Sequence, residues 1–125
     1  MKPRKVLVVD DSKLLHRMFE MMLRQYPLVH AYDGREALDR LVEHKDVDLI
    51  LLDVNMPRMN GLEFLAAVKA NTETAHIPVV IITTEGAEAD TEKGLAAGAS
   101  AYVKKPFRNE ELLGVINRLS ESPAA

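Results

Sequence analysis

Cysteine and tryptophan are both absent from this chain of 125 residues. Without cysteine, neither a disulfide framework nor a thiolate metal site can form, which is compatible with a reducing cytoplasm. Long hydrophobic runs are also lacking, since no segment approaches the ~20 apolar residues that a membrane helix requires. The apolar run after the basic residues 1–5 meets Asp10 and Asp11, too early for the core of a signal peptide. A cytoplasmic location without membrane insertion is therefore expected.

A large excess of either charge is lacking as well. The net charge is −3, with acidic and basic residues interspersed, whereas a nucleic-acid-binding domain favours a basic patch. Direct binding to nucleic acid is therefore not expected. Hydrophobic residues make up 47% and charged residues 28% of the chain, which is ordinary for a globular protein. This composition and length predict a single domain over residues 1–125, with a frayed tail at 120–125.

The chain does contain an alternation of strand and helix patterns. Short apolar, β-branched runs predict buried strands at 5–9, 28–31, 48–52, 78–82 and 101–104. Residues at helical spacing occupy the intervals and follow the last strand. Ser12 is the predicted N-cap of the first helix, which Pro27 would end, and Asn109 is the predicted cap of the last helix. The alternation indicates an α/β fold, doubly wound, in which helices cover both faces of a parallel sheet.

Reactive side chains stand at the predicted carboxyl ends of these strands. Asp10 and Asp11 follow the first strand, Asp53 the third, Thr83 the fourth and Lys105 the fifth. Ligands of such sheets bind beyond this edge, where the strand order reverses. Carboxylates that crowd together repel each other unless a cation neutralises them, and their hard oxygens favour magnesium or calcium. The pattern therefore predicts a divalent metal site suited to phosphoryl transfer.

Four sequence blocks, in this order and at these spacings, point to one family. They are Val8–Ser12, Leu52–Pro57 with Gly61, Ile81–Thr83, and Gly98–Ala99 followed by Tyr102–Phe107. With them, the chain resembles the receiver domain of two-component response regulators from about residue 5 to residue 119, and its form is that of the single-domain chemotaxis regulators of the CheY type. The resemblance implies a flavodoxin-like sheet in the order 2-1-3-4-5.

The resemblance also implies the roles of the site residues. Asp53 would accept a phosphoryl group from a phosphohistidine on a sensor histidine kinase. Mg²⁺ would be bound by the side chains of Asp11 and Asp53 and the carbonyl of Asn55, with Asp10 acting mainly through water. Lys105 would contact a phosphoryl oxygen.

A second set of implied roles concerns signalling and reset. Thr83 would turn to the phosphoryl group and Tyr102 would rotate inward, which changes the face made by the fourth helix, fifth strand and fifth helix. Asn55 and Glu85 would tune access of the hydrolytic water and give a short-lived phosphoryl state. The chain would thus catalyse its own phosphorylation and dephosphorylation without turning over an external substrate.

Each residue also has a purely structural interpretation. Asp10, Asp11 and Asp53 suit helix caps, Thr83 suits a strand, Lys105 suits the surface and Tyr102 suits a half-buried core position. The histidines at 16, 30, 44 and 76 lack metal-ligand spacing and are interpreted as surface or packing residues. The methionines at 18, 22, 56 and 59 are interpreted as side chains that fill gaps in the core rather than bind a cofactor.

Two other functions remain open at this point. The chain could be the receiver of a larger regulator, for example a DNA-binding one, although Ala101 stands where many such receivers have an acidic residue. It could also be a phosphatase of similar topology, although Asn55 cannot serve as the general acid. The acidic residues between 85 and 92 argue against a flagellar-switch target, so an unidentified protein target and a monomeric state are expected.

Overall fold

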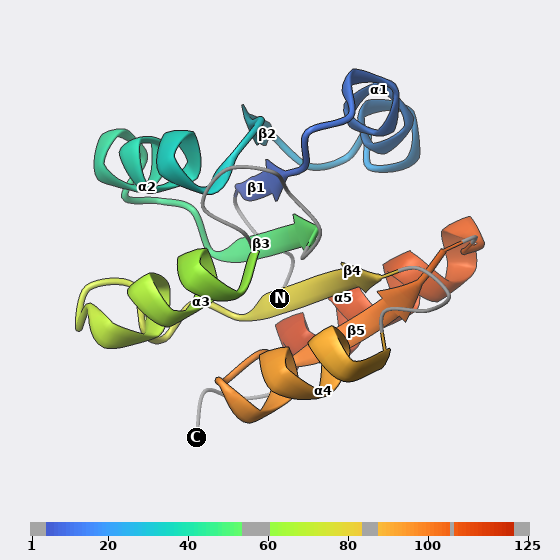
Figure 1. The fold of residues 1–125 in the computed structure, drawn as a ribbon. Coiled ribbons are helices and arrows are strands. Elements are labelled where there is room, and N and C mark those ends of the chain that lie inside the picture. Colours follow the sequence, from blue (N-terminus) through green and yellow to red (C-terminus); the bar gives the residue numbers. More distant parts are fainter. Residues whose placement is uncertain (1–4, 54–60, 84–87, 106, 122–125) are drawn as a thin grey trace.

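The computed structural model describes residues 5–53, 61–83, 88–105 and 107–121. They contain one parallel sheet in the order β2-β1-β3-β4-β5, formed by β1 (Val6–Val9), β2 (Leu28–Ala31), β3 (Leu49–Asp53), β4 (Val79–Thr83) and β5 (Ala101–Lys104). Helices lie on both sides of it (Figure 1), namely α1 (Lys13–Met22), α2 (Gly34–Glu43), α3 (Gly61–Ala70), α4 (Glu88–Ala96) and α5 (Asn109–Glu121). The predicted fold class and strand order are confirmed.

Alternating side chains of the central strands feed two separate cores. In β1, Leu7 and Val9 join the core beneath α2 and α3, while Val6 and Val8 join the core beneath α1 and α5. All four are fully buried, because a parallel sheet covered on both faces has no solvent-facing side. Each such aliphatic side chain contributes about 1.5–3 kcal/mol by leaving water. This two-sided burial fixes the strand ends that carry the polar residues.

The helix ends agree only in part with the predictions. Ser12 caps α1 as predicted, and its Oγ accepts a 3.2 Å hydrogen bond from the amide of Leu15. The helix ends at Met22 rather than near Pro27, because the backbone of Leu23 (φ −115°, ψ 42°) has left helical geometry, although its amide still donates to the carbonyl of Phe19. The prediction that Asn109 caps α5 is wrong.

At the start of α5, Asn109 is the first helical residue. The carbonyl oxygen of the preceding residue, Arg108, accepts a hydrogen bond from the amide of Leu112. The amide of Arg108 in turn donates to Oε1 of Glu111. Glu111 thus supplies the glutamate half of a capping box, which places the cap one residue earlier. The helix continues to Glu121, so the predicted tail overlaps it at 120–121, and residues 122–125 lie outside the described residues.

Strands β1, β3 and β4 differ by one residue from the predicted boundaries, whereas β2 and β5 match them. Strand β3 includes Asp53 and β4 includes Thr83 as last residues, so both polar side chains are held by the sheet itself. Among the core predictions, Met18 is wrong, since it is 43% exposed on the outer side of α1. No helix among the described residues is long and apolar enough to span a membrane.

Candidate functional site

Three carboxylates meet at the carboxyl end of β1 and β3. Val9 pairs with Leu52 in the parallel register, so the next residues, Asp10 and Asp53, emerge side by side. Together with Asp11 they offer oxygen atoms that all lie within 4.8 Å of one another. Asp10 and Asp53 are buried, whereas Asp11 is exposed. The sequence analysis predicted that side chains at the carboxyl ends of these strands lie together, and the three carboxylates do so.

Asp10 lies in surroundings that disfavour its charged form. Its side chain is 2% exposed, and Oδ1 accepts a 2.8 Å hydrogen bond from the amide of Ser12. Its Oδ2 has no hydrogen-bond partner among the described residues. Burial raises the pKa of Asp10 to about 6, the Ser12 amide opposes this, and the negative charge of Asp53 adds to it.

An orphaned, buried carboxylate oxygen beside two further carboxylates fits a hard divalent cation. Magnesium binds through one or two carboxylates and retains several waters, so a partly exposed set of oxygen ligands suits it. A buried charge is costly unless it is paired, and the Lys105 ammonium at 3.8 Å offsets this cost only in part, since the pKa of Asp10 stays raised. The residues present therefore fit Mg²⁺, with Asp10, Asp11 and Asp53 as the available side chains.

Lys105 is the cation that the protein itself supplies. Its Nζ lies 3.8 Å from Oδ2 of Asp10, and its side chain is 27% exposed. The amide of Lys105 donates a 2.6 Å hydrogen bond to the carbonyl of Thr83, which holds the end of β5 against β4. The ammonium can therefore reach the cluster without closing it to a ligand.

Thr83 is the last residue of β4, the strand that pairs with the Asp53 strand β3. It is 4% exposed and lies one position beyond Ile82, the register partner of Asp53. Its Oγ1 accepts a 2.8 Å hydrogen bond from Oγ1 of Thr91 on α4. The hydroxyl of Thr83 is thus in contact with α4 in this structure.

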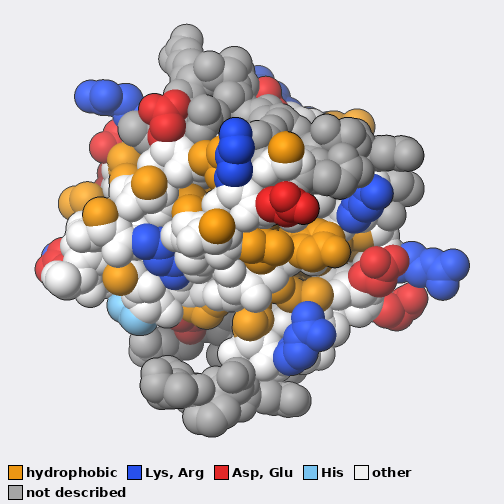
Figure 2. Space-filling model, turned by 60° about the horizontal axis from the view of Figure 1, so that its bottom comes forward, with side chains coloured by type: hydrophobic (Ala, Val, Ile, Leu, Met, Phe, Trp, Pro, Cys, Tyr) orange, Lys and Arg blue, Asp and Glu red, His pale blue; other side chains and the backbone are white. Residues whose placement is uncertain are grey.

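Tyr102 is separate from the cluster. It lies opposite Ile81 in the sheet, and its side chain is 51% exposed, so the alternative of a half-buried core aromatic is wrong. Figure 2 shows the side of the molecule that carries α4, where hydrophobic side chains lie among charged ones of both signs. Leu95, 38% exposed, contributes to the exposed apolar surface of α4.

The predicted residues Asn55 and Glu85 lie outside the described residues. The role of the Asn55 carbonyl as a ligand of Mg²⁺, and the role of both residues in tuning hydrolysis, therefore stay predictions.

Two histidines near the site were not predicted to have polar partners. His16 on α1 is 2% exposed, and its Nε2 lies 2.8 Å from the carbonyl oxygen of Asp10. Its Nδ1 lies 2.6 Å from Nδ1 of His30 on β2. Burial lowers the pKa of His16, so the ring favours its neutral form, in which Nε2–H donates to Asp10.

One feature of the sequence indicates that His16 needs a polar partner. His16 follows Leu15 and precedes Phe19 by three, so it lies on the inward side of the helix. An inward histidine needs a polar partner. Spacing alone does not reveal that the partners are a backbone carbonyl and a histidine 14 residues away.

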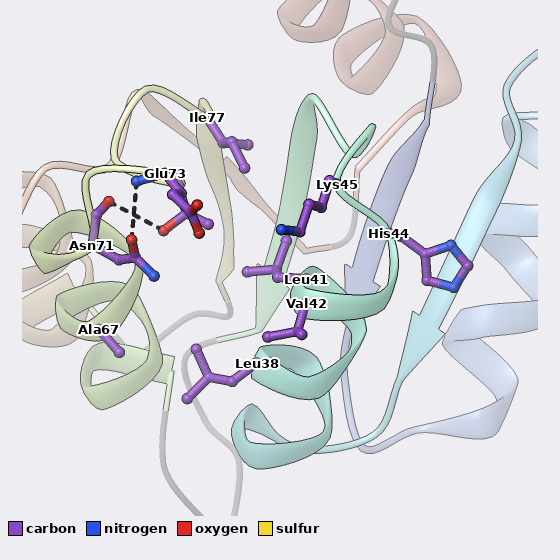
Figure 3. Close-up of a pocket in the computed structure, with 10 residues that line it drawn as sticks. Leu38, Leu41, Val42, His44, Lys45, Ala67, Asn71, Glu73 and Ile77 are labelled. Atoms are coloured by element: carbon purple, nitrogen blue, oxygen red, sulfur yellow. Dashed lines mark hydrogen bonds between the residues drawn. The ribbon is translucent and has the colours of Figure 1, made fainter.

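A cavity of about 310 Å³ lies between α2 and α3, at the opposite end of the sheet (Figure 3). Leu38, Leu41 and Val42 form its apolar side, and Asn71 and Glu73 border it. The amide of Glu73 donates to Oδ1 of Asn71. None of the carboxylates of the cluster lines this cavity.

Comparison with known proteins decides the family. Residues 6–117 match the response regulator receiver domain. The chain belongs to this family. A chemotaxis protein CheY homolog from Campylobacter jejuni is 38% identical to this receiver over 111 residues, which cover 86% of the chain and 85% of the relative.

Two further proteins show the range of the family. The transcriptional regulatory protein CpxR of Escherichia coli is 38% identical over 92% of this receiver, which spans only 48% of CpxR. The receiver domain of sensor histidine kinase PA1611 from Pseudomonas aeruginosa, solved with a magnesium ion in its active-site cleft, has a TM-score of 0.86 and 27% identity, covering 95% of this chain and 98% of that one. The chain is therefore a phosphoacceptor signalling module, of a family that takes phosphate from histidine kinases.

Proposed function

We propose that Asp53 is the phosphoacceptor and that Asp10, Asp11 and Asp53, with the carbonyl of Asn55, hold Mg²⁺. A carboxylate oxygen of Asp53 attacks the phosphorus of a phosphohistidine, the N–P bond breaks, and an acyl phosphate forms while the imidazole leaves. When bound, Mg²⁺ neutralises charge that develops on the phosphoryl oxygens. The observation that carries this proposal is the orphaned oxygen of Asp10 within the carboxylate cluster.

The chain's own residues have defined parts in this proposal. Lys105, already near the cluster, binds one phosphoryl oxygen and stabilises its charge. Thr83 turns its hydroxyl to another. Water then attacks the phosphorus, which releases phosphate and restores the Asp53 carboxylate, and Asn55 and Glu85 set the rate of this step. We expect a phosphoryl lifetime well below hours.

The output follows from a change of population between two states. Turning of Thr83 frees space into which Tyr102 rotates from its exposed position, and this alters the face of α4, β5 and α5. A bias of a few kcal/mol is enough for such a shift. A protein target would bind this face with different affinity in the two states. A cytoplasmic location and a monomeric resting state remain predictions.

The first test uses beryllium fluoride, which imitates a phosphoryl group on a carboxylate. Amide NMR spectra of the wild type and Asp53→Asn would be compared during titration with Mg²⁺ and then beryllium fluoride. Changes around Asp11, Thr83 and Lys105 that spread to Tyr102 and α4, and that vanish in the variant, are expected. A wild type that binds Mg²⁺ but ignores beryllium fluoride would contradict the proposal.

A second candidate is supported by CpxR, of which this receiver spans less than half. The chain would then be the regulatory part of a longer protein, and activation would drive pairing of receivers. Light scattering with Mg²⁺ and beryllium fluoride distinguishes the two. A doubling of mass favours the longer regulator, whereas an unchanged mass favours a stand-alone module.

A further inference from the structure

Helix α4 contacts β4 at two points one turn apart. Thr91 donates its hydroxyl proton to Oγ1 of Thr83 over 2.8 Å, and the two side chains are 7% and 4% exposed. Three residues further on, Gly94 lies so close to the sheet that an added Cβ would overlap Cδ1 of Ile81. Gly94 thus lets the helix backbone approach the strand, and Thr91 makes a hydrogen bond to the strand's last residue.

The hydrogen bond joins α4 to the residue that is expected to move. Thr83 has one hydroxyl oxygen, and its side chain occupies staggered positions about the Cα–Cβ bond. A turn to another position carries Oγ1 away from Thr91 and presents a methyl group or a hydrogen in its place. The 2.8 Å hydrogen bond between the two hydroxyls is then lost, and its contribution must be recovered by a movement of Thr91 or α4.

We propose that Thr91 is a positioning residue that holds Thr83 in its resting orientation, and that breaking the Thr83–Thr91 hydrogen bond transmits phosphorylation to α4. This inference rests on the proposed function of Asp53 and Thr83. It assigns the link between the site and the helix to one hydrogen bond. Because the bond exists only in the resting state, its removal favours the activated state.

Thr91→Val tests the inference because valine keeps the shape of threonine and removes the hydroxyl. In the presence of Mg²⁺, Thr91→Val is expected to bind beryllium fluoride about fivefold more tightly than the wild type, the equivalent of one ordinary hydrogen bond. Amides of α4 in this variant are expected to lie, before any addition, part of the way toward their positions in the activated wild type. Thr91→Ser, which keeps the hydroxyl, is expected to restore wild-type affinity.

Thr74→Val is the matched control. The hydroxyl of Thr74 donates a 2.7 Å hydrogen bond to the carbonyl of Val68, at the far end of α3 from the site. Its loss removes a threonine side-chain hydrogen bond, here to a backbone carbonyl, without touching Thr83. The affinity for beryllium fluoride is expected to stay within a factor of about two of the wild type.

Failure of this inference is distinguishable from failure of the proposed function. If the wild type responds to beryllium fluoride but Thr91→Val binds it no more tightly, the inference alone is overturned. If the wild type does not respond, the proposed function fails and the signalling part of the inference fails with it.

A double-mutant cycle of Thr83→Val and Thr91→Val, measured by unfolding without ligand, tests the resting bond by itself. A coupling of about fivefold in the folding equilibrium constant is expected, and strictly additive effects would overturn the inference whatever the phosphoryl chemistry.

Discussion

Lys69 and Asp10 allow the two ends of the sheet to be compared. Lys69, in the last turn of α3, lies at the amino end of the strands, and its half-buried ammonium donates to the carbonyls of Ala75 and Ile77 at 3.0 and 2.9 Å. Asp10, at the carboxyl end, accepts one side-chain hydrogen bond for its two oxygens among the described residues, and the Lys105 ammonium lies 3.8 Å away. Burial disfavours the charged form of each group, so it lowers the pKa of Lys69 and raises that of Asp10.

The difference lies in how the cost of burial is offset. At the amino end, the protein supplies hydrogen-bond acceptors that satisfy the charge. At the carboxyl end, it collects carboxylates and leaves one oxygen for a ligand from outside. Sites that bind ligands commonly sacrifice stability in this way. Substitutions at the two ends should therefore separate stability from Mg²⁺ binding.

The largest effect is expected from Asp10→Asn. Loss of a carboxylate next to the metal should weaken Mg²⁺ binding by about 10- to 100-fold. Without Mg²⁺ and at pH 7, the same variant should be more stable by about 1–3 kcal/mol, because it no longer buries a carboxylate whose burial and neighbouring carboxylates outweigh the attraction of Lys105. Calorimetric Mg²⁺ titration and urea unfolding measure the two effects. A variant that loses stability in Mg²⁺-free buffer would contradict this account of Asp10.

The pH dependence of the free energy of unfolding should show an effect of Asp10 of similar size. The folded pKa of Asp10, about 6, lies above its ordinary value of 3.8. Between these values the folded state binds more protons than the unfolded state, so this group's contribution to stability falls as the pH rises. Burial lowers the pKa of His16 below 6.5, which gives the opposite trend as the pH falls below 6.5.

A comparison of wild type with Asp10→Asn isolates the carboxyl, since His16 is present in both. The variant's advantage should be near zero at pH 4 and reach about 1–3 kcal/mol by pH 7. Saturating Mg²⁺ should remove this advantage. A difference that does not change with pH would show that Asp10 is not protonated in this range.

Lys69→Met tests the amino end. Methionine keeps the apolar stem but leaves the carbonyls of Ala75 and Ile77 without their donor. A loss of about 1–3 kcal/mol in the free energy of unfolding is expected, with no change in Mg²⁺ affinity. An altered Mg²⁺ affinity would mean that the two ends of the sheet are coupled.

The carboxyl end was the more predictable of the two from sequence. Asp10, Asp53 and Thr83 end apolar runs, and parallel strands bring such ends to one edge, so their neighbourhood follows from the fold class. The strand order came from the family resemblance. The residues at 54–60 and 84–87 follow β3 and β4 in the sequence but lie outside the described residues, so the roles of Asn55 and Glu85 remain untested.

Partners that depend on how a helix is rotated were not predictable. Lys69, Thr91 and His16 lie on helices, and each finds its partner through the depth and rotation of that helix against the sheet. Spacing along the chain does not contain this information. The end of α1 at Met22 was missed because Pro27 only forbids a helix beyond it, whereas the backbone of Leu23 already leaves helical geometry.

The smallest effect is expected from Gly98→Ala at the amino end. Gly98 has φ +116°, and a Cβ there would lie 3.2 Å from Cγ of Lys69. Left-handed backbone costs a residue with a Cβ about 1–2 kcal/mol, so the variant should lose about that much stability. Gly114→Ala on α5, where an added Cβ meets nothing within 4 Å, should instead gain up to ~1 kcal/mol from helix propensity. Neither change should alter Mg²⁺ or beryllium fluoride binding, because neither touches the carboxyl end. If Gly98→Ala altered either affinity, strain at the end of α4 would reach the site, and the separation of the two ends would fail at that helix.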